Sequence, residues 1–327
     1  MRRKIVSFLI LFIFVSFGIL YFPYPSAAAA GADLHGRIVI LDPGHGFDHT
    51  NTYEDYDEQV TMLKLALKIK PLLEARGADV YMTRPTEAEI PLPARAAIIN
   101  RWALNTLKAA KQDELSDPEC QNPDILQSDI DEINRLLRIV QSVINDPETN
   151  APVYLNNPFD YTYTREMHPD WREVLKLESD PVIRDRFLVI SLHSNATPKP
   201  IDESKSGVEI YYASNSMEDS MTYFADYSYE ELNIYFGRLL MDRLTGCGLE
   251  KRFIKFNNFL ILREHNLPCV LVENGYHTNE LDRAMLSDDA FLDRLALIYA
   301  DAVTDYFSKL GSLVKLYYPE PMNDVFG

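Results

Sequence analysis

Apolar and polar residues alternate along this chain in two kinds of block. Short apolar runs rich in Val, Ile, Leu and Tyr have the length of buried β-strands and lie at 37–42, 79–84, 187–192, 208–213 and 269–274. Longer segments with apolar residues at helical spacing predict helices at 58–77, 92–111, 229–246 and 288–311. Strands that alternate with helices predict an α/β fold, a three-layer α/β/α sandwich around a mostly parallel sheet.

One segment, residues 113–185, departs from this alternation. It is acidic and rich in Pro, Asn and Tyr; within it, 128–146 has the pattern of one amphipathic helix, and 151–171 reads as an irregular loop. We therefore expect a large helical and irregular insertion inside a single catalytic domain at 36–310. Residues 311–327 would form a C-terminal tail.

The N-terminus has the pattern of an export signal. The basic stretch MRRK precedes an apolar run at 5–22, and small residues suited to cleavage follow, so we expect a signal peptide within 1–30. The apolar run is also near the lower length of a membrane span, which makes an uncleaved anchor the alternative. In both cases the rest of the chain is expected outside the cytoplasmic membrane, in the periplasm or extracellular space.

Net charge and cysteine content exclude one class of binding partner and one class of fold. The 327 residues carry a formal net charge of −17, which argues against nucleic acid, because phosphate binding needs clustered Lys and Arg. Three cysteines are too few for a disulfide framework. Cys269, in an apolar run, is expected to be buried, and one bridge between Cys120 and Cys247 stays open as an alternative.

Two histidines stand where strands are expected to end. His45 lies in VILDPGHG, after the first strand and between two glycines that allow a sharp turn, and His193 follows the third strand in VISLHSNA. Functional sites of α/β sheets form at the carboxyl ends of strands. One histidine at such a place is more often structural, but two favour a metal site.

Two carboxylates complete the candidate site. The third ligand would be Glu58 or Glu54, and Glu58 is the better candidate because it opens a predicted helix, which would hold it rigidly. Glu273 directly follows the apolar stretch VLV, where an unpaired carboxylate is costly to bury. Two histidines, one carboxylate and an open position are typical of catalytic zinc, and a second carboxylate such as Glu273 could carry the proton.

Seven blocks occur in the order of a known family: IVILDPGHG, EQVTMLKLALKIKPLLEARG, VYMTRP, LPARAAIIN, VISLHSNA, SGVEIYY and LPCVLVENGYHTN. The chain resembles the zinc-dependent N-acetylmuramoyl-L-alanine amidases of the third amidase family. The resemblance implies one zinc ion per chain, held by His45, Glu58 and His193, with Glu273 as the catalytic glutamate. It also implies peptidoglycan as the substrate. Phe47 departs from the pattern, because the family usually has a second glycine there.

Two other functions fit the same residues. An exported zinc peptidase acting within stem peptides would use the same ligands, and a wall-binding protein that has lost catalysis would keep the fold. The acidic helix at 128–146 has two interpretations as well. It would either cap the domain, or cover the zinc site until an activator protein moves it.

Several other residues are expected to support the site. We expect Arg84 and Arg95 to pair with carboxylates and position helices, and Asp42 to support the loop that carries His45. Asn195 would hold a loop or contact substrate. His49 and His277 are near the candidate ligands in sequence, but exposed loop histidines are the commoner case.

Overall fold

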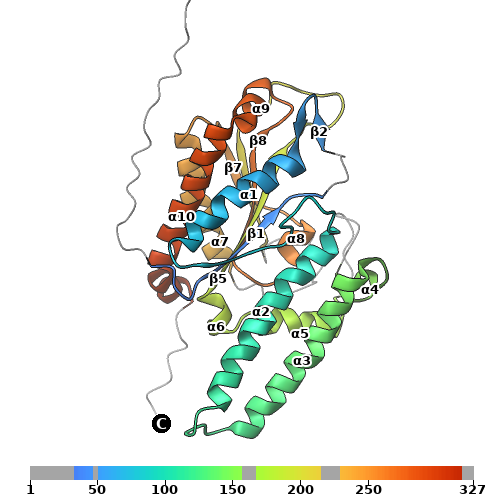
Figure 1. Ribbon diagram of the computed structural model, residues 1–327, viewed down its shortest axis with the longest axis vertical. Helices are drawn as coiled ribbons and strands as arrows, with labels where there is room; N and C mark the ends of the chain where they lie inside the picture. The colour runs from blue at the N-terminus through green and yellow to red at the C-terminus, as the bar shows by residue number, and fades with distance from the viewer. Residues whose placement is uncertain (1–32, 47–50, 157–166, 215–228, 319–327) are drawn as a thin grey trace, which may run out of the picture. The chain divides into compact units, whose positions relative to one another are not determined.

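The computed structural model describes residues 33–46, 51–156, 167–214 and 229–318, and their centre is a six-stranded sheet (Figure 1). The strand order is β4-β1-β5-β8-β6-β7. Strands β4, β1, β5 and β8 run parallel, β6 is antiparallel to β8, and β7 is parallel to β6. The bounds are β1 Ile38–Pro43, β4 Asp79–Met82, β5 Phe187–Asn195, β6 Val208–Tyr212, β7 Lys251–Phe256 and β8 Cys269–Tyr276. A small hairpin pairs β2 Thr52–Tyr53 with β3 Tyr56–Asp57.

Helices cover both faces of the sheet (Figure 1). On one face lie α1 Glu58–Glu74, α7 Glu230–Gly246, α9 Glu280–Ser287 and α10 Asp289–Tyr317. On the other lie α2 Leu92–Leu115, α3 Pro123–Asn145, α4 Pro147–Tyr154, α5 Pro169–Leu177, α6 Pro181–Arg184 and α8 Leu260–Arg263. The three-layer α/β/α sandwich with a mostly parallel sheet is therefore confirmed.

Strand residues alternate between two cores. In β1, Val39 and Leu41 pack with the helices of the first face, and Ile38 and Ile40 pack with those of the second. Successive side chains of a strand point to opposite faces, so a strand between two helical layers is apolar throughout. This explains why the predicted strands appeared as continuous apolar runs.

Several boundaries differ from the sequence prediction. Strand β5 continues beyond 192 to Asn195, so His193 lies within this strand and not after it. Strand β8 continues beyond 274 to Tyr276, and Glu273 lies within it, as the predicted bounds had it. Helix α1 contains Pro71 in its last turn and ends at Glu74, before the predicted end at 77, because proline removes one hydrogen bond of the helix and crowds the preceding turn. Strand β7 was missed: it lies at the sheet edge and none of its residues is fully buried, so it has no apolar run.

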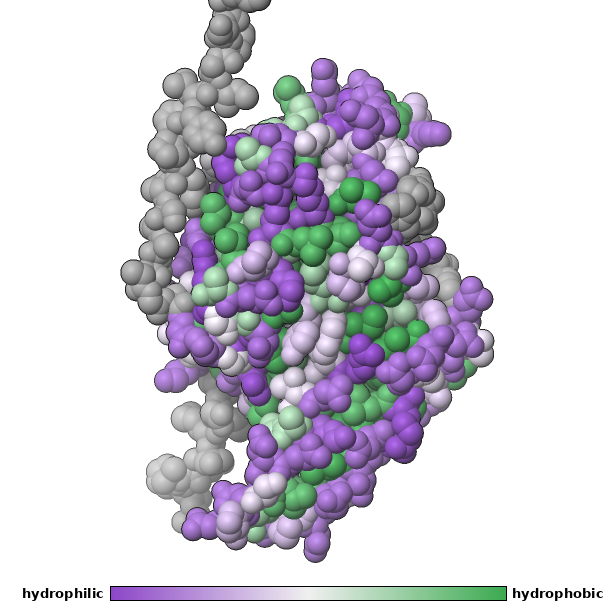
Figure 2. All heavy atoms as spheres, viewed as in Figure 1, coloured by the Kyte–Doolittle hydropathy of each residue, from purple (hydrophilic) through white to green (hydrophobic). Residues whose placement is uncertain are grey.

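The segment from α3 to α6 is mainly helical in its described residues, 123–156 and 167–184, and these pack onto the same core as α2 and the sheet. The predicted helix at 128–146 is part of α3, but the loop expected at 151–171 begins inside α4 and ends inside α5; its centre lies outside the described residues. The second half of α2 runs beyond the sheet and pairs with α3. Figure 2 shows apolar residues between these two helices and hydrophilic residues along their outer sides.

The described residues begin at Asp33 and end at Tyr318. Helix α10 continues to Tyr317, past the expected domain end at 310. The predicted signal peptide lies outside the described residues, and so does His49. Within the described part of the chain, no helix is both long and apolar enough to cross a membrane. Cys120, Cys247 and Cys269 are all free, so the bridge considered between the first two is not formed.

Candidate metal site at the sheet edge

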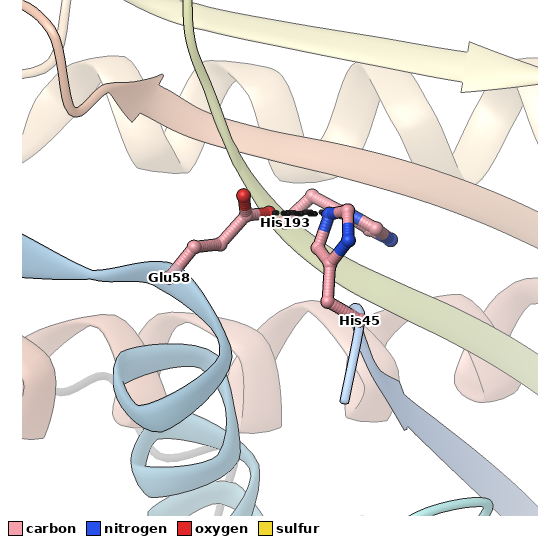
Figure 3. Close-up of side chains that lie close together, drawn as sticks. All are labelled: His45, Glu58 and His193. Carbon is pink, nitrogen blue, oxygen red and sulfur yellow. Dashed lines mark hydrogen bonds and ion pairs between the residues drawn. The ribbon is translucent and has the colours of Figure 1, made fainter. Parts of the chain in front are cut away.

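His45, Glu58 and His193 lie together although they come from three separate elements (Figure 3). His45 follows β1, Glu58 is the first residue of α1, and His193 is in β5. Oε1 of Glu58 is 3.3 Å from Nε2 of His45 and 3.1 Å from Nδ1 of His193. One nitrogen or oxygen of each residue lies within 4.8 Å of the others.

These distances suit a zinc ion. A tetrahedral site with bonds of about 2.1 Å separates its ligand atoms by roughly 3.4 Å, close to the two separations at Glu58. Two imidazoles and one carboxylate form the donor set of catalytic zinc sites, which keep a fourth position open. The cluster of these three side chains therefore fits zinc in both donor chemistry and spacing.

Glu58 is held in place by the start of α1. Asp57 caps the helix by accepting a hydrogen bond from the backbone N–H of Val60, and the Ser194 N–H donates to Oε1 of Glu58 at 3.0 Å. Burial alone would raise the pKa of Glu58, but its hydrogen bonds with His193 and His45 outweigh burial, and the pKa lies well below its usual range. The carboxylate is thus charged, as a metal ligand must be.

The glycine before His45 has a specific role. A Cβ atom at Gly44 would lie 2.4 Å from Cε1 of His193, so only glycine lets the His193 ring reach the cluster. The sharp turn expected of the glycines falls on His45 itself, whose φ is 60°. Asn51 Nδ2 lies 2.8 Å from Nδ1 and 2.7 Å from Nε2 of His45, a contact that the sequence did not suggest.

Two buried arginines support the site. Arg95 forms an ion pair with Asp42 at 2.9 Å, as expected, and Thr83 and Ser191 also donate to this carboxylate. Arg84 was expected to pair with a carboxylate as well, but it donates to backbone carbonyls, which include Gly44 at 3.0 Å and Gln59 at 2.9 Å. It therefore ties the loop of His45 to the start of α1.

Glu273 lies beside the cluster. It is opposite His193 in the β5–β8 pairing and opposite Glu209 in the β6–β8 pairing. Its Oε2 is buried and has no hydrogen-bond partner among the residues that the structure describes. Burial raises the pKa of Glu273 well above its usual value, and the charges of Glu58 and Glu209 add to the rise; a nearby cation would act in the opposite direction.

A pocket of about 300 Å³ adjoins these residues. Its polar lining includes His45, His193, Glu273 and Arg95. Its other walls are mainly apolar and come from the loop before α2, the start of α2, β8, and α8 with the preceding Phe259. The pocket thus brings a candidate metal site and a half-buried carboxylate together beside mainly apolar walls.

Glu209 is a further buried carboxylate at this edge that the sequence analysis missed. It accepts hydrogen bonds from Asn195 at 3.0 Å, from Tyr211 and Tyr276 at 2.6 Å each, and from Arg252 at 2.6 Å. Four donors from β5, β6, β7 and β8 thus converge on one group. Glu209 is a carboxylate within the apolar strand of SGVEIYY, as Glu273 is within CVLVEN, so the same sequence pattern indicates both residues.

Other candidates lie outside the cluster. Glu54, the alternative ligand, is exposed and pairs with Arg283. His277 is buried, with Nδ1 3.1 Å from Oγ of Ser194, and is not among the candidate ligands. No described residue of α3 lines the pocket, so the described residues do not form the occluding arrangement considered for this helix.

The fold and the cluster define an α/β protein with a candidate catalytic metal site. The chain belongs to the N-acetylmuramoyl-L-alanine amidase family, whose sequence model matches residues 39–107 and 157–305, about two thirds of the chain. The matched part contains all four predicted site residues. It also contains α5 and α6, which the sequence analysis had assigned to the insertion.

Individual relatives are more distant. The chain is 23% identical over 298 residues to N-acetylmuramoyl-L-alanine amidase AmiC of Escherichia coli O6:H1. The aligned part is 89% of this chain but only 57% of that protein. It is 21% identical to AmiA of Salmonella typhimurium over 83% of this chain and 76% of that one. The solved structure of the amidase Ami1 from Mycobacterium smegmatis aligns with a TM-score of 0.48 and 15% identity, over 85% of this chain and 99% of that one.

Proposed function

We propose that this protein is a zinc-dependent amidase of peptidoglycan. It would hydrolyse the amide that joins the lactyl group of N-acetylmuramic acid to the first L-alanine of the stem peptide. The observation that carries the proposal is the convergence of His45, Glu58 and His193 in a member of this family, beside a pocket that contains a second, half-buried carboxylate, Glu273.

Each residue then has a role. His45, Glu58 and His193 would hold one zinc ion, which when bound supplies Lewis-acid polarisation of a carbonyl oxygen and lowers the pKa of a water molecule to about 7. Glu273 would accept at Oε2, which has no partner among the described residues, the proton that the attacking water loses, and would deliver it to the leaving amine nitrogen as the amide C–N bond breaks. The mainly apolar pocket would exclude bulk water from the reacting amide and suit the methyl groups on either side of it.

We place this reaction outside the cytoplasmic membrane, in the periplasm or extracellular space. Peptidoglycan lies there, and the N-terminal sequence has the pattern of an export signal or membrane anchor. An activator protein stays a prediction from the sequence. Its expected mechanism, removal of α3 from the pocket, has no support in the described residues.

The direct test is product analysis after incubation of purified sacculi with the purified protein. The expected products carry a new amino terminus on L-alanine, a chelator stops their release, and added zinc restores it. An amino terminus inside the stem peptide would instead identify a zinc peptidase. Wall binding without any soluble product would identify a protein that has lost catalysis, and either result would overturn the proposal.

A further inference from the structure

The turn that follows α8 is polar but completely buried. Arg263, Glu264, His265 and Asn266 are each at most 1% exposed. Such groups must find hydrogen bonds inside the protein, because burying them without partners is costly. The same short helix contributes its other side to the pocket beside the candidate metal site, through Leu260 and Ile261.

Partners for this turn come from the α3–α6 segment. The backbone N–H of Asn156, after α4, donates to Oε2 of Glu264 at 3.2 Å. The N–H of Asn266 donates to Oε2 of Glu178, after α5, at 2.5 Å. The side-chain amide of Asn266 donates to the backbone carbonyl of Leu175 at 3.1 Å. Both ends of the turn are thus fixed to residues between 156 and 178.

Helix α2 holds the same turn from a second side. Asn100 donates from its side-chain amide to the backbone carbonyl of Glu264 at 2.9 Å. Apolar packing supports these bonds, since Leu260 and Ile261 share one buried core cluster with Trp171 and Val174 of α5. The pocket wall at α8 is therefore part of the same apolar core as α5.

We propose that the α3–α6 segment is a positioning element for the substrate pocket, acting through Glu178 and the Asn156 backbone on the turn after α8. The proposal rests on the proposed function only in its statement about substrate. Glu178 contacts neither the pocket nor the candidate ligands, so it is a positioning residue and not a catalytic one. The segment would support the site rather than cover it.

The test compares Glu178→Ala with Glu178→Gln and with Glu148→Ala, which removes an exposed carboxylate from the same segment. In Glu178→Ala, hydrogen exchange of peptides covering 259–267 should become about tenfold faster or more, because one anchor of the turn is lost. KM for a soluble muropeptide should rise about 5- to 50-fold with a smaller change in kcat and unchanged zinc content. Glu178→Gln keeps the acceptor for Asn266 and should restore both readouts, and Glu148→Ala should leave both unchanged.

Hydrogen exchange and KM report on different parts of the idea. Unchanged exchange at 259–267 in Glu178→Ala would overturn the proposal, and so would faster exchange with an unchanged KM. Hydrogen exchange is measurable even in a protein without amidase activity, so failure of the proposed function can be distinguished from failure of this positioning proposal. Should Glu178→Ala not fold, Ser179→Ala provides the milder test, because it removes only the Oγ atom that accepts from Asn266 at 2.8 Å. The same direction of change is expected there, and its absence would also overturn the proposal.

Discussion

Two buried carboxylates, Glu58 at the sheet edge and Glu178 behind the pocket wall, differ in what surrounds them. They are 2% and 1% exposed. Two imidazoles keep the pKa of Glu58 well below its usual range despite burial. Burial raises the pKa of Glu178 to about 8, and the hydrogen bond from the Asn266 N–H offsets only part of that rise.

This difference separates a binding site from a structural anchor. A buried carboxylate that stays ionised between two imidazoles is prepared for a cation. A buried carboxyl that favours its protonated form has no need of one, and serves as a hydrogen-bonding group within the core. Burial of an acidic residue is therefore weak evidence for a metal site until its neighbours are known.

The largest difference is expected in zinc content, when the same substitution is made separately at Glu58 and at Glu178. Glu58→Gln removes the anionic ligand and should abolish zinc binding and activity, as should His193→Ala. Glu178→Gln should retain one zinc ion per chain, and His35→Ala, at an exposed histidine, controls for loss of an imidazole. Metal content after gel filtration measures this directly. Full zinc content in Glu58→Gln would exclude it as a ligand.

Glu273 provides the next test, because it lies at the same edge without belonging to the ligand cluster. Glu273→Gln should lower kcat by about 10²- to 10⁴-fold, the usual loss on removing a proton-transfer group, and leave zinc content unchanged. Rates on a soluble muropeptide, with metal analysis of the same samples, measure both. A rate near that of the unchanged protein would remove Glu273 from the proposed mechanism.

The sequence predicted the sheet edge better than the rest of the fold. Buried strands have continuous apolar runs, so β1, β5 and β8 were identified, and their ends indicated where His45, His193 and Glu273 would meet. Edge strand β7 escaped because exposed strands need no such run. The roles of the four site residues remain predictions.

Long-range partners were less predictable. The sequence gives no sign that Arg84 bonds to backbone carbonyls, or that Glu178 reaches the turn at Asn266, because neither partner is close in the chain. The helices of the α3–α6 segment were only partly predicted, because proline begins all four of them and the frequency of proline in this segment suggested a loop. Prolines at the first helical position are compatible with a helix, and this was overlooked at α4 and α5.

Asn51 tests how tightly the sheet edge is organised around His45. Loss of its side chain in Asn51→Ala should weaken zinc affinity about 10- to 100-fold, because groups that orient a metal-binding histidine have effects of this size. Competition with a chromophoric chelator measures the affinity without relying on activity. Asn105→Ala, at an exposed position of α2, is the matched control. Equal affinities for both variants would show that the contact does not orient His45.

The smallest effect concerns the pH dependence of stability at the anchor. The pKa of Glu178 is about 8 in the folded protein and near 4.5 when the chain is unfolded, so the folded state binds this proton more tightly. Its contribution to stability is therefore complete below about pH 4.5 and is lost as the pH rises through 8. The side chain of Glu178→Gln cannot lose a proton, so this variant keeps the stability that the unchanged protein loses as the pH rises. The free energy of unfolding of the variant, relative to that of the unchanged protein, should therefore increase by about 1 to 4 kcal/mol between pH 5 and 8.5. Urea unfolding of both proteins across this range measures the gap, in which the contributions of all other carboxylates cancel. Parallel curves would show that Glu178 has the same pKa in both states, and the contrast with Glu58 would then be lost.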